Sequence, residues 1–148
     1  MRLVVFCLWM LLALPAPLPA QDAIPRENQI VLTQDECPTA GKIEWVPSPD
    51  ETAAALAAIR SFLASDTPAL PPYPARRKEI LGKFAQYKVK FSGVKPGGKR
   101  IIHCYFYSMH AAGGSVEDTV DDGGSHFWRI DVDPESQTCT NFSCNGES

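Results

Sequence analysis

The chain has 148 residues, of which 45% are hydrophobic and 21% are charged, and its formal net charge at pH 7 is −3. A mildly acidic chain without a large basic cluster lacks the charge pattern of a nucleic-acid-binding protein. The densest basic run, Arg76-Arg77-Lys78, is short and is typical of a solvated helix face. We therefore expect no nucleic-acid partner and no binding to a membrane surface.

Residues 1–20 have the pattern of a secretory signal peptide. Arg2 supplies a positive charge, residues 3–14 form an unbroken apolar run, and a proline-rich segment then ends in the small residue Ala20. This order is typical of a cleavable signal. The apolar run is shorter than the about 20 residues that span a membrane, and a retained anchor is the alternative. The pattern predicts cleavage after Ala20, no membrane span afterwards, and a periplasmic or extracellular location.

The remaining cysteines are candidates for disulfide bonds. An exported protein meets an oxidising compartment, where cysteines pair in preference to remaining as thiols. Counting alone does not choose among the possible pairings. Zinc is the alternative, but no two cysteines have the close CxxC-type spacing of structural zinc sites. The disulfide candidates are Cys37, Cys104, Cys139 and Cys144.

The first part of the expected mature chain leads into a helix. Residues 21–40 are polar and predict an extended lead-in, and residues 42–46 can form a short strand. Ser48 then occupies the N-cap of a predicted helix, with proline at its first position and glutamate three residues after the cap. The helix is expected to end near Ala64. Its apolar stripe recurs at helical spacing at Leu56, Ile59 and Leu63.

A proline-rich connector and a short helix over residues 75–84 precede two alternating segments, 87–92 and 100–108. The turn signal at residues 94–99 predicts that these segments form a hairpin. If Val94 faces Lys99, then Phe91 faces Ile102 and Val89 faces Cys104. One face of the hairpin would then carry Tyr87, Val89, Phe91, Ile102, Cys104 and Phe106, and the other the lysines with His103, Tyr105 and Tyr107.

A second hairpin is predicted from residues 126–134 and 138–146, joined by a turn at 135–137. In the simplest register Thr140 and Phe142 share a face with Trp128, Ile130 and Val132, and Arg129, Asp131 and Asp133 point the other way. Cys139 and Cys144 differ in parity and would face opposite sides of a regular strand, unless a bulge interrupts it. Residues 41–148 thus predict one α+β domain, with one long helix packed on a four-stranded antiparallel meander.

Several segments resemble a set of small exported bacterial proteins of unknown function. The segments are Tyr87, 91–94 and 98–102, then DGGS-x-FW at 122–128, Asp133-Pro134-Glu135 and Asn145-Gly146-Glu147. The resemblance covers about residues 80–148 and implies a cystatin-like, helix-on-sheet shape and an exported address. It implies no activity, and the four cysteines are not part of the pattern.

The sequence contains no recognisable catalytic motif. Its three histidines match no metal-ligand spacing, and residues 117–124 lack the ligand order of a calcium loop. We expect no catalytic residue, metal site or cofactor. One alternative is a small metal-dependent hydrolase that uses the histidines with the acidic loop; another is a purely structural envelope protein. The hydrolase would use His103, His110 or His126 with Asp121 or Asp122.

The sheet face opposite the helix is the candidate binding surface. Aromatic side chains and arginine are enriched at interfaces, and this face is expected to carry His103, Tyr105, Tyr107, Phe127 and Arg129. Alternatively, residues 21–40 or 110–125 fold over it. We hypothesise an exported binding module whose ligand is a protein or a small molecule; an inhibitor of a secreted hydrolase is one version, suggested by the cystatin-like shape alone.

Overall fold

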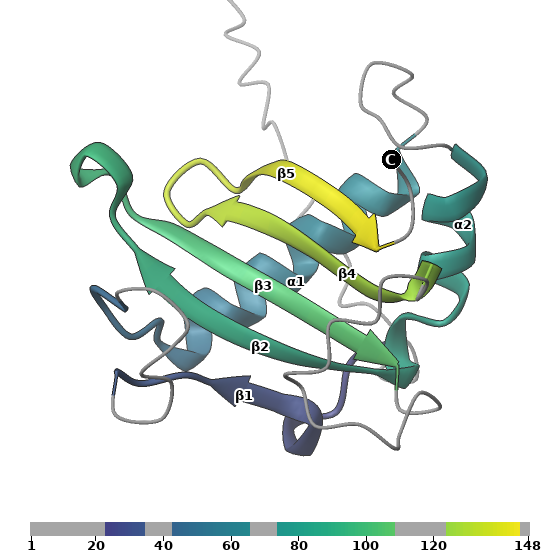
Figure 1. Ribbon diagram of the computed structural model, residues 1–148, viewed down its shortest axis with the longest axis horizontal. Coiled ribbons are helices and arrows are strands. Elements are labelled where there is room, and N and C mark those ends of the chain that lie inside the picture. Colours follow the sequence, from purple (N-terminus) through teal and green to yellow (C-terminus); the bar gives the residue numbers. More distant parts are fainter. Residues whose placement is uncertain (1–22, 35–42, 66–73, 109–123, 146–148) are drawn as a thin grey trace, which may run out of the picture.

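The computed structural model describes residues 23–34, 43–65, 74–108 and 124–145, which form an α+β fold. Two helices pack on a five-stranded mixed sheet of order β1-β2-β3-β4-β5 (Figure 1). The helices are α1 (Pro49–Ala64) and α2 (Pro74–Gly82). The strands are β1 (Gln29–Val31), β2 (Tyr87–Val94), β3 (Ile101–Ser108), β4 (Gly124–Asp133) and β5 (Thr138–Asn145).

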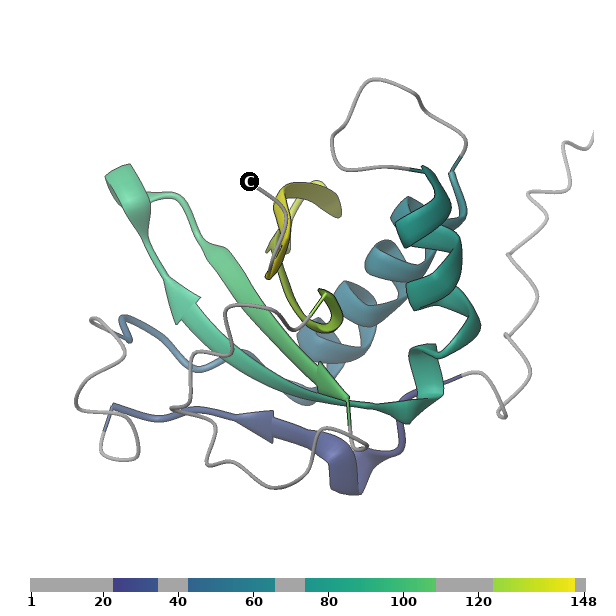
Figure 2. The same ribbon diagram turned by 45° about the vertical axis from the view of Figure 1, so that its right-hand side comes forward.

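Helix α1 begins and ends where the sequence predicts. The Ser48 hydroxyl accepts from the Glu51 backbone N–H at 3.2 Å, and the Glu51 carboxylate accepts from the Ser48 N–H at 2.8 Å. These two bonds satisfy amides that have no partner within the first turn. The predicted stripe at Leu56, Ile59 and Leu63 is buried. Because α1 crosses one face of the sheet, that face becomes the core (Figures 1 and 2).

The prediction of four antiparallel strands is wrong in one respect, because a fifth strand joins the sheet. β1, from the expected lead-in, pairs in parallel with β2, with Ile30 opposite Lys90. Farther along the same edge Trp45 forms an isolated antiparallel bridge to Gly93, within the segment predicted as a short strand. A three-residue strand is too short to show alternation, and its parallel partner is distant in sequence. Local patterns therefore could not reveal this pairing.

The first hairpin has the predicted faces but a register shifted by two residues. Val94 pairs with Ile101, Phe91 with Cys104, and Val89 with Phe106. The longer turn contains a 3-10 segment at Pro96–Gly98, with positive φ at both glycines. Since side chains alternate with a period of two, a two-residue shift leaves every side chain on its predicted face.

The second hairpin contains a bulge in β5, and one of the two β5 side chains predicted to face the core does not do so. Arg129 pairs with Ser143 but Asp131 pairs with Thr140, so β5 has one extra residue between these pairs. Asn141, inside the bulge, has φ 52°. The extra residue reverses the parity of the strand. Consequently Cys139 and Cys144 both pair with core-facing residues, Val132 and Trp128. Thr140, between the turn and the bulge, is exposed opposite Asp131, so its predicted place on the core face is wrong. Phe142 packs against Trp128 with ring centroids 5.8 Å apart, as predicted.

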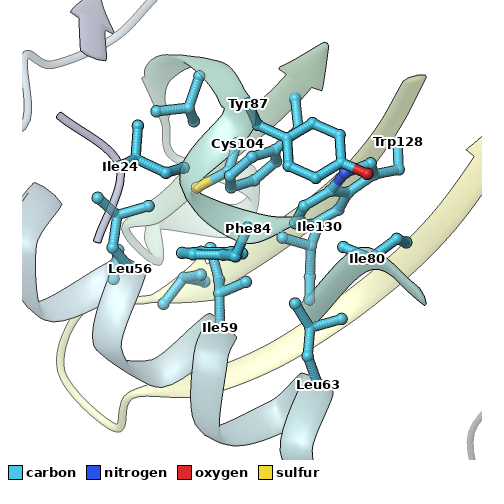
Figure 3. Close-up of a cluster of buried hydrophobic side chains, with 14 of the residues drawn as sticks. Ile24, Leu56, Ile59, Leu63, Ile80, Phe84, Tyr87, Cys104, Trp128 and Ile130 are labelled. Carbon is cyan, nitrogen blue, oxygen red and sulfur yellow. The ribbon is translucent and has the colours of Figure 1, made fainter. Parts of the chain in front are cut away.

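The core lies between the sheet and the two helices (Figure 3). Its centre is aromatic: Phe106 and Trp128 stack with ring centroids 3.7 Å apart and planes 3° from parallel. Tyr87 meets both rings edge-on, and its hydroxyl donates to the Ser125 carbonyl at 2.7 Å. The buried apolar residues come from α1, α2, β2, β3, β4 and β5, so one core unites these elements.

Three of the disulfide candidates lie in the described part of the chain. Cys104 is buried and Cys139 half-buried, and both are thiols. Burial raises the pKa of Cys104 well above its usual value and that of Cys139 to about 11. Cys144 is buried on the same face of the sheet. Cys37 lies outside the described residues, so its pairing stays a prediction.

Candidate functional site

The face of the sheet opposite α1, which we call the open face, carries the side chains that alternate with the core residues. Figure 1 looks onto this face, and no described helix or strand lies in front of it. The strand register arranges its side chains in three rows. The rows are Lys88–Tyr107–Phe127, Ile30–Lys90–Tyr105–Arg129–Ser143, and Ser92–His103–Asp131–Thr140.

The five residues selected from the sequence lie together on this face. Tyr105 pairs directly with Arg129, Tyr107 with Phe127, and His103 occupies the next row. Tyr105 is 42% exposed and Arg129 is also exposed, while the other three are half-buried. The rings of His103 and Tyr105 are 6.4 Å apart in an edge-on arrangement. Burial raises the pKa of Tyr107.

His103 is held by Asp131 from the neighbouring strand. Its Nδ1 is hydrogen-bonded to one Asp131 oxygen, and Asn141 Nδ2 donates to the other oxygen at 2.7 Å. Burial raises the pKa of Asp131, but the hydrogen bonds from His103 and Asn141 and the charges of His103 and Arg129 outweigh burial and lower it. An ionised carboxylate only accepts, so Nδ1 carries a proton. Nε2 is then the ring nitrogen that a ligand can use.

Two hollows adjoin this cluster and share His103, Asp131 and Asn141. The first has a volume of about 420 Å³ and the second about 510 Å³. Both volumes are in the range of small-ligand sites. The first is lined by the shared residues together with Tyr105, Arg129, Phe142 and Ser143. The second is lined by the shared residues together with Glu44, Val94, Pro96, Ile101 and Thr140.

Arg129 is fixed in position at the first hollow. Its Nε donates to the Ser143 hydroxyl at 2.9 Å, and Ser143 is its partner in the β4–β5 register. The two terminal nitrogens of the guanidinium form no hydrogen bond within the described ranges. They therefore remain available as paired donors for a planar acceptor such as a carboxylate.

The described residues contain no candidate metal centre. Within residues 23–34, 43–65, 74–108 and 124–145, no group of three or more His, Cys, Asp or Glu residues could hold an ion. His126 is exposed near the start of β4. The other components of the hydrolase alternative, His110, Asp121 and Asp122, lie outside the described residues. So do residues 110–123 of the loop that the alternative interpretation places over the face.

Sequence reasoning missed several residues of this site. Asp131 was placed on the correct face, but its pairing with His103 depends on the β3–β4 register. Ser143 faces Arg129 as the simplest register of the second hairpin already implies. Asn141 contacts Asp131 from within the bulge in β5, whose sequence contains no glycine to indicate it. Lys90 and Ile30 complete the central row, and the alternation of β2 already indicated the lysine.

None of the described helices is both long and apolar enough to cross a membrane. The chain matches no family model, no curated protein and no solved structure.

Proposed function

We propose that the protein is an exported, non-enzymatic binding module that recognises its partner through the open face. One observation carries this proposal: Tyr105 and Arg129, both exposed, are direct cross-strand neighbours beside a hollow of about 420 Å³. Tyrosine and arginine supply most of the energy of many interfaces, because each combines a large contact area with directed hydrogen bonds.

The exported location rests on the signal-like pattern of residues 1–20. The resemblance to small exported bacterial proteins supports the same location, and the cystatin-like form of the fold remains part of this proposal. A helix-on-sheet fold by itself indicates no particular activity, so the argument for binding depends on the side chains of the open face.

The proposal is tested by affinity capture followed by titration of the captured partner. Tagged protein is exposed to envelope and medium extracts of its source, and each captured protein is then purified and titrated calorimetrically. The test variant carries Tyr105→Ala and Tyr107→Ala. A matched control carries Ser61→Ala and Lys78→Ala, two exposed helix positions away from the open face. Circular dichroism verifies that both variants are folded.

Saturable binding that is lost in the tyrosine variant and kept in the control supports the proposal. Equal binding by both variants would place the interaction elsewhere on the protein. If no extract yields a saturable partner, the binding-module proposal fails, and metal analysis of the purified protein then decides between the hydrolase and structural alternatives.

A further inference from the structure

The open face is positively charged although the chain as a whole is acidic. By alternation Asp133 also faces this side, where it is paired with Lys99, and Glu44 lines the second hollow. The three rows described above contain Lys88, Lys90 and Arg129 but only one carboxylate, Asp131. That carboxylate is occupied by His103 and Asn141. Neither lysine forms an ion pair with another residue in the described segments. The formal net charge of the chain is −3, so the positive charge of this face is local.

The cations surround aromatic side chains. Lys90 and Arg129 flank Tyr105 in one row, and Lys88 lies beside Tyr107 in the next. A surface of this kind attracts carboxylates through the cations and contacts apolar or planar groups through the rings. The Ser143 hydroxyl orients the Nε side of the Arg129 guanidinium, so part of its side-chain freedom is already restricted before the terminal nitrogens bind a carboxylate.

The size of the face limits the partner. Five strands spaced about 4.8 Å apart cover about 20 Å, and the eight residues of β3 extend about 27 Å. The length of about 27 Å matches an extended segment of about eight residues, at about 3.4 Å per residue. The face therefore suits one extended segment of about this length.

We propose that the open face binds an acidic, extended segment of a partner protein, with carboxylates on Arg129 and Lys90 and apolar contacts on Tyr105 and Tyr107. This inference rests on the proposed function and names the chemistry of its partner. Charge complementarity supplies the specificity, and the one carboxylate within the three rows, Asp131, is already hydrogen-bonded by its neighbours.

The test uses fluorescein-labelled deca-L-glutamate as the probe, with deca-L-glutamine as its uncharged counterpart and polygalacturonate as a carbohydrate carrying the same carboxylates. Fluorescence anisotropy measures binding of the peptides to the full purified protein, and polygalacturonate is tested as a competitor and by calorimetry. The variant Lys90→Gln/Arg129→Gln removes two cations from the central row. Lys78→Gln/Lys95→Gln removes two exposed cations outside the rows and serves as the charge-matched control.

We expect saturable binding of deca-L-glutamate, none of deca-L-glutamine, and an affinity about tenfold lower in the central-row variant. Affinity should fall as salt rises to about 0.15 M. If the charge-matched control loses as much affinity as the central-row variant, the loss reflects the net charge of the protein and the inference is overturned. If calorimetry detects binding of polygalacturonate and the peptide does not bind, the inferred protein partner is wrong and the ligand is an acidic carbohydrate.

The two proposals can fail separately. Suppose that a captured partner loses affinity when Tyr105 and Tyr107 are replaced but binds Lys90→Gln/Arg129→Gln normally. The proposal of a binding module would then stand, and the inference that its partner is acidic would be refuted. Absence of both a captured partner and probe binding would refute both.

Discussion

Adjacent residues of β3 should differ sharply in their contribution to stability. Tyr105 points to the open face and is 42% exposed, whereas Phe106 is 2% exposed. The Phe106 ring stacks on Trp128 at 3.7 Å and lies 6.0 Å from Phe84 and 6.3 Å from Tyr87. Removing this ring leaves a cavity at the centre of the core, so Phe106→Ala should lower the free energy of unfolding by about 3–5 kcal/mol.

Tyr105→Ala should lower the free energy of unfolding by only about 0.5–1 kcal/mol, the size of one cross-strand side-chain contact. Domains of this size are commonly stable by about 5–15 kcal/mol, so Phe106→Ala risks not folding. Phe106→Leu is therefore the second variant, with an expected loss of about 1–2 kcal/mol.

Urea unfolding followed by tryptophan fluorescence measures these differences. If the slope of the unfolding free energy against urea concentration is unchanged, the variant exposes as much surface on unfolding as the unsubstituted protein does. If Tyr105→Ala costs as much as Phe106→Leu or more, the tyrosine is covered in solution. The face assignment on which the proposed function depends would then be wrong.

Three further substitutions test local features of the fold. Ser48→Ala removes the helix cap and should cost about 1 kcal/mol in urea unfolding, whereas Ser61→Ala, at an exposed helical position, should change little; equal effects would contradict the capping role. Gly93→Ala would place a Cβ in steric conflict with the Trp45 carbonyl oxygen and indole ring, so we expect a loss of about 1–3 kcal/mol and altered tryptophan fluorescence. Unchanged fluorescence and stability would refute this close contact. Hydrogen bonds, first from the Ser125 hydroxyl, lower the pKa of Glu79 from 4.5 to about 2. Because the folded-state pKa is depressed, this stabilisation is complete above about pH 4.5 and is lost as the pH falls towards 2. Since the side chain is 37% exposed, screening reduces the effect to about 1 kcal/mol. Glu79→Gln should therefore be less stable near pH 7, with the difference disappearing by about pH 2; a difference that persists there would contradict the linkage.

The placement of the binding candidates followed from alternation, but their interactions did not. Alternation along β3 and β4 was enough to put His103, Tyr105 and Arg129 on one face. It could not indicate that His103 meets Asp131, or that Asn141 reaches the same carboxylate. These contacts join different strands, so they depend on registers that no single segment of sequence specifies.

Local chemistry by itself determined the start and end of α1 and the inward or outward direction of most strand residues. A helix cap involves residues three apart, and strand alternation depends only on neighbours, so both can be read along the chain. Tertiary structure alone decided the parallel pairing of β1 with β2, the two-residue shift of the first hairpin and the bulge at Asn141. Each of these features depends on segments that are distant in sequence, because together they must pair their backbone hydrogen bonds and fill one core. The outcome therefore depends on the complete fold.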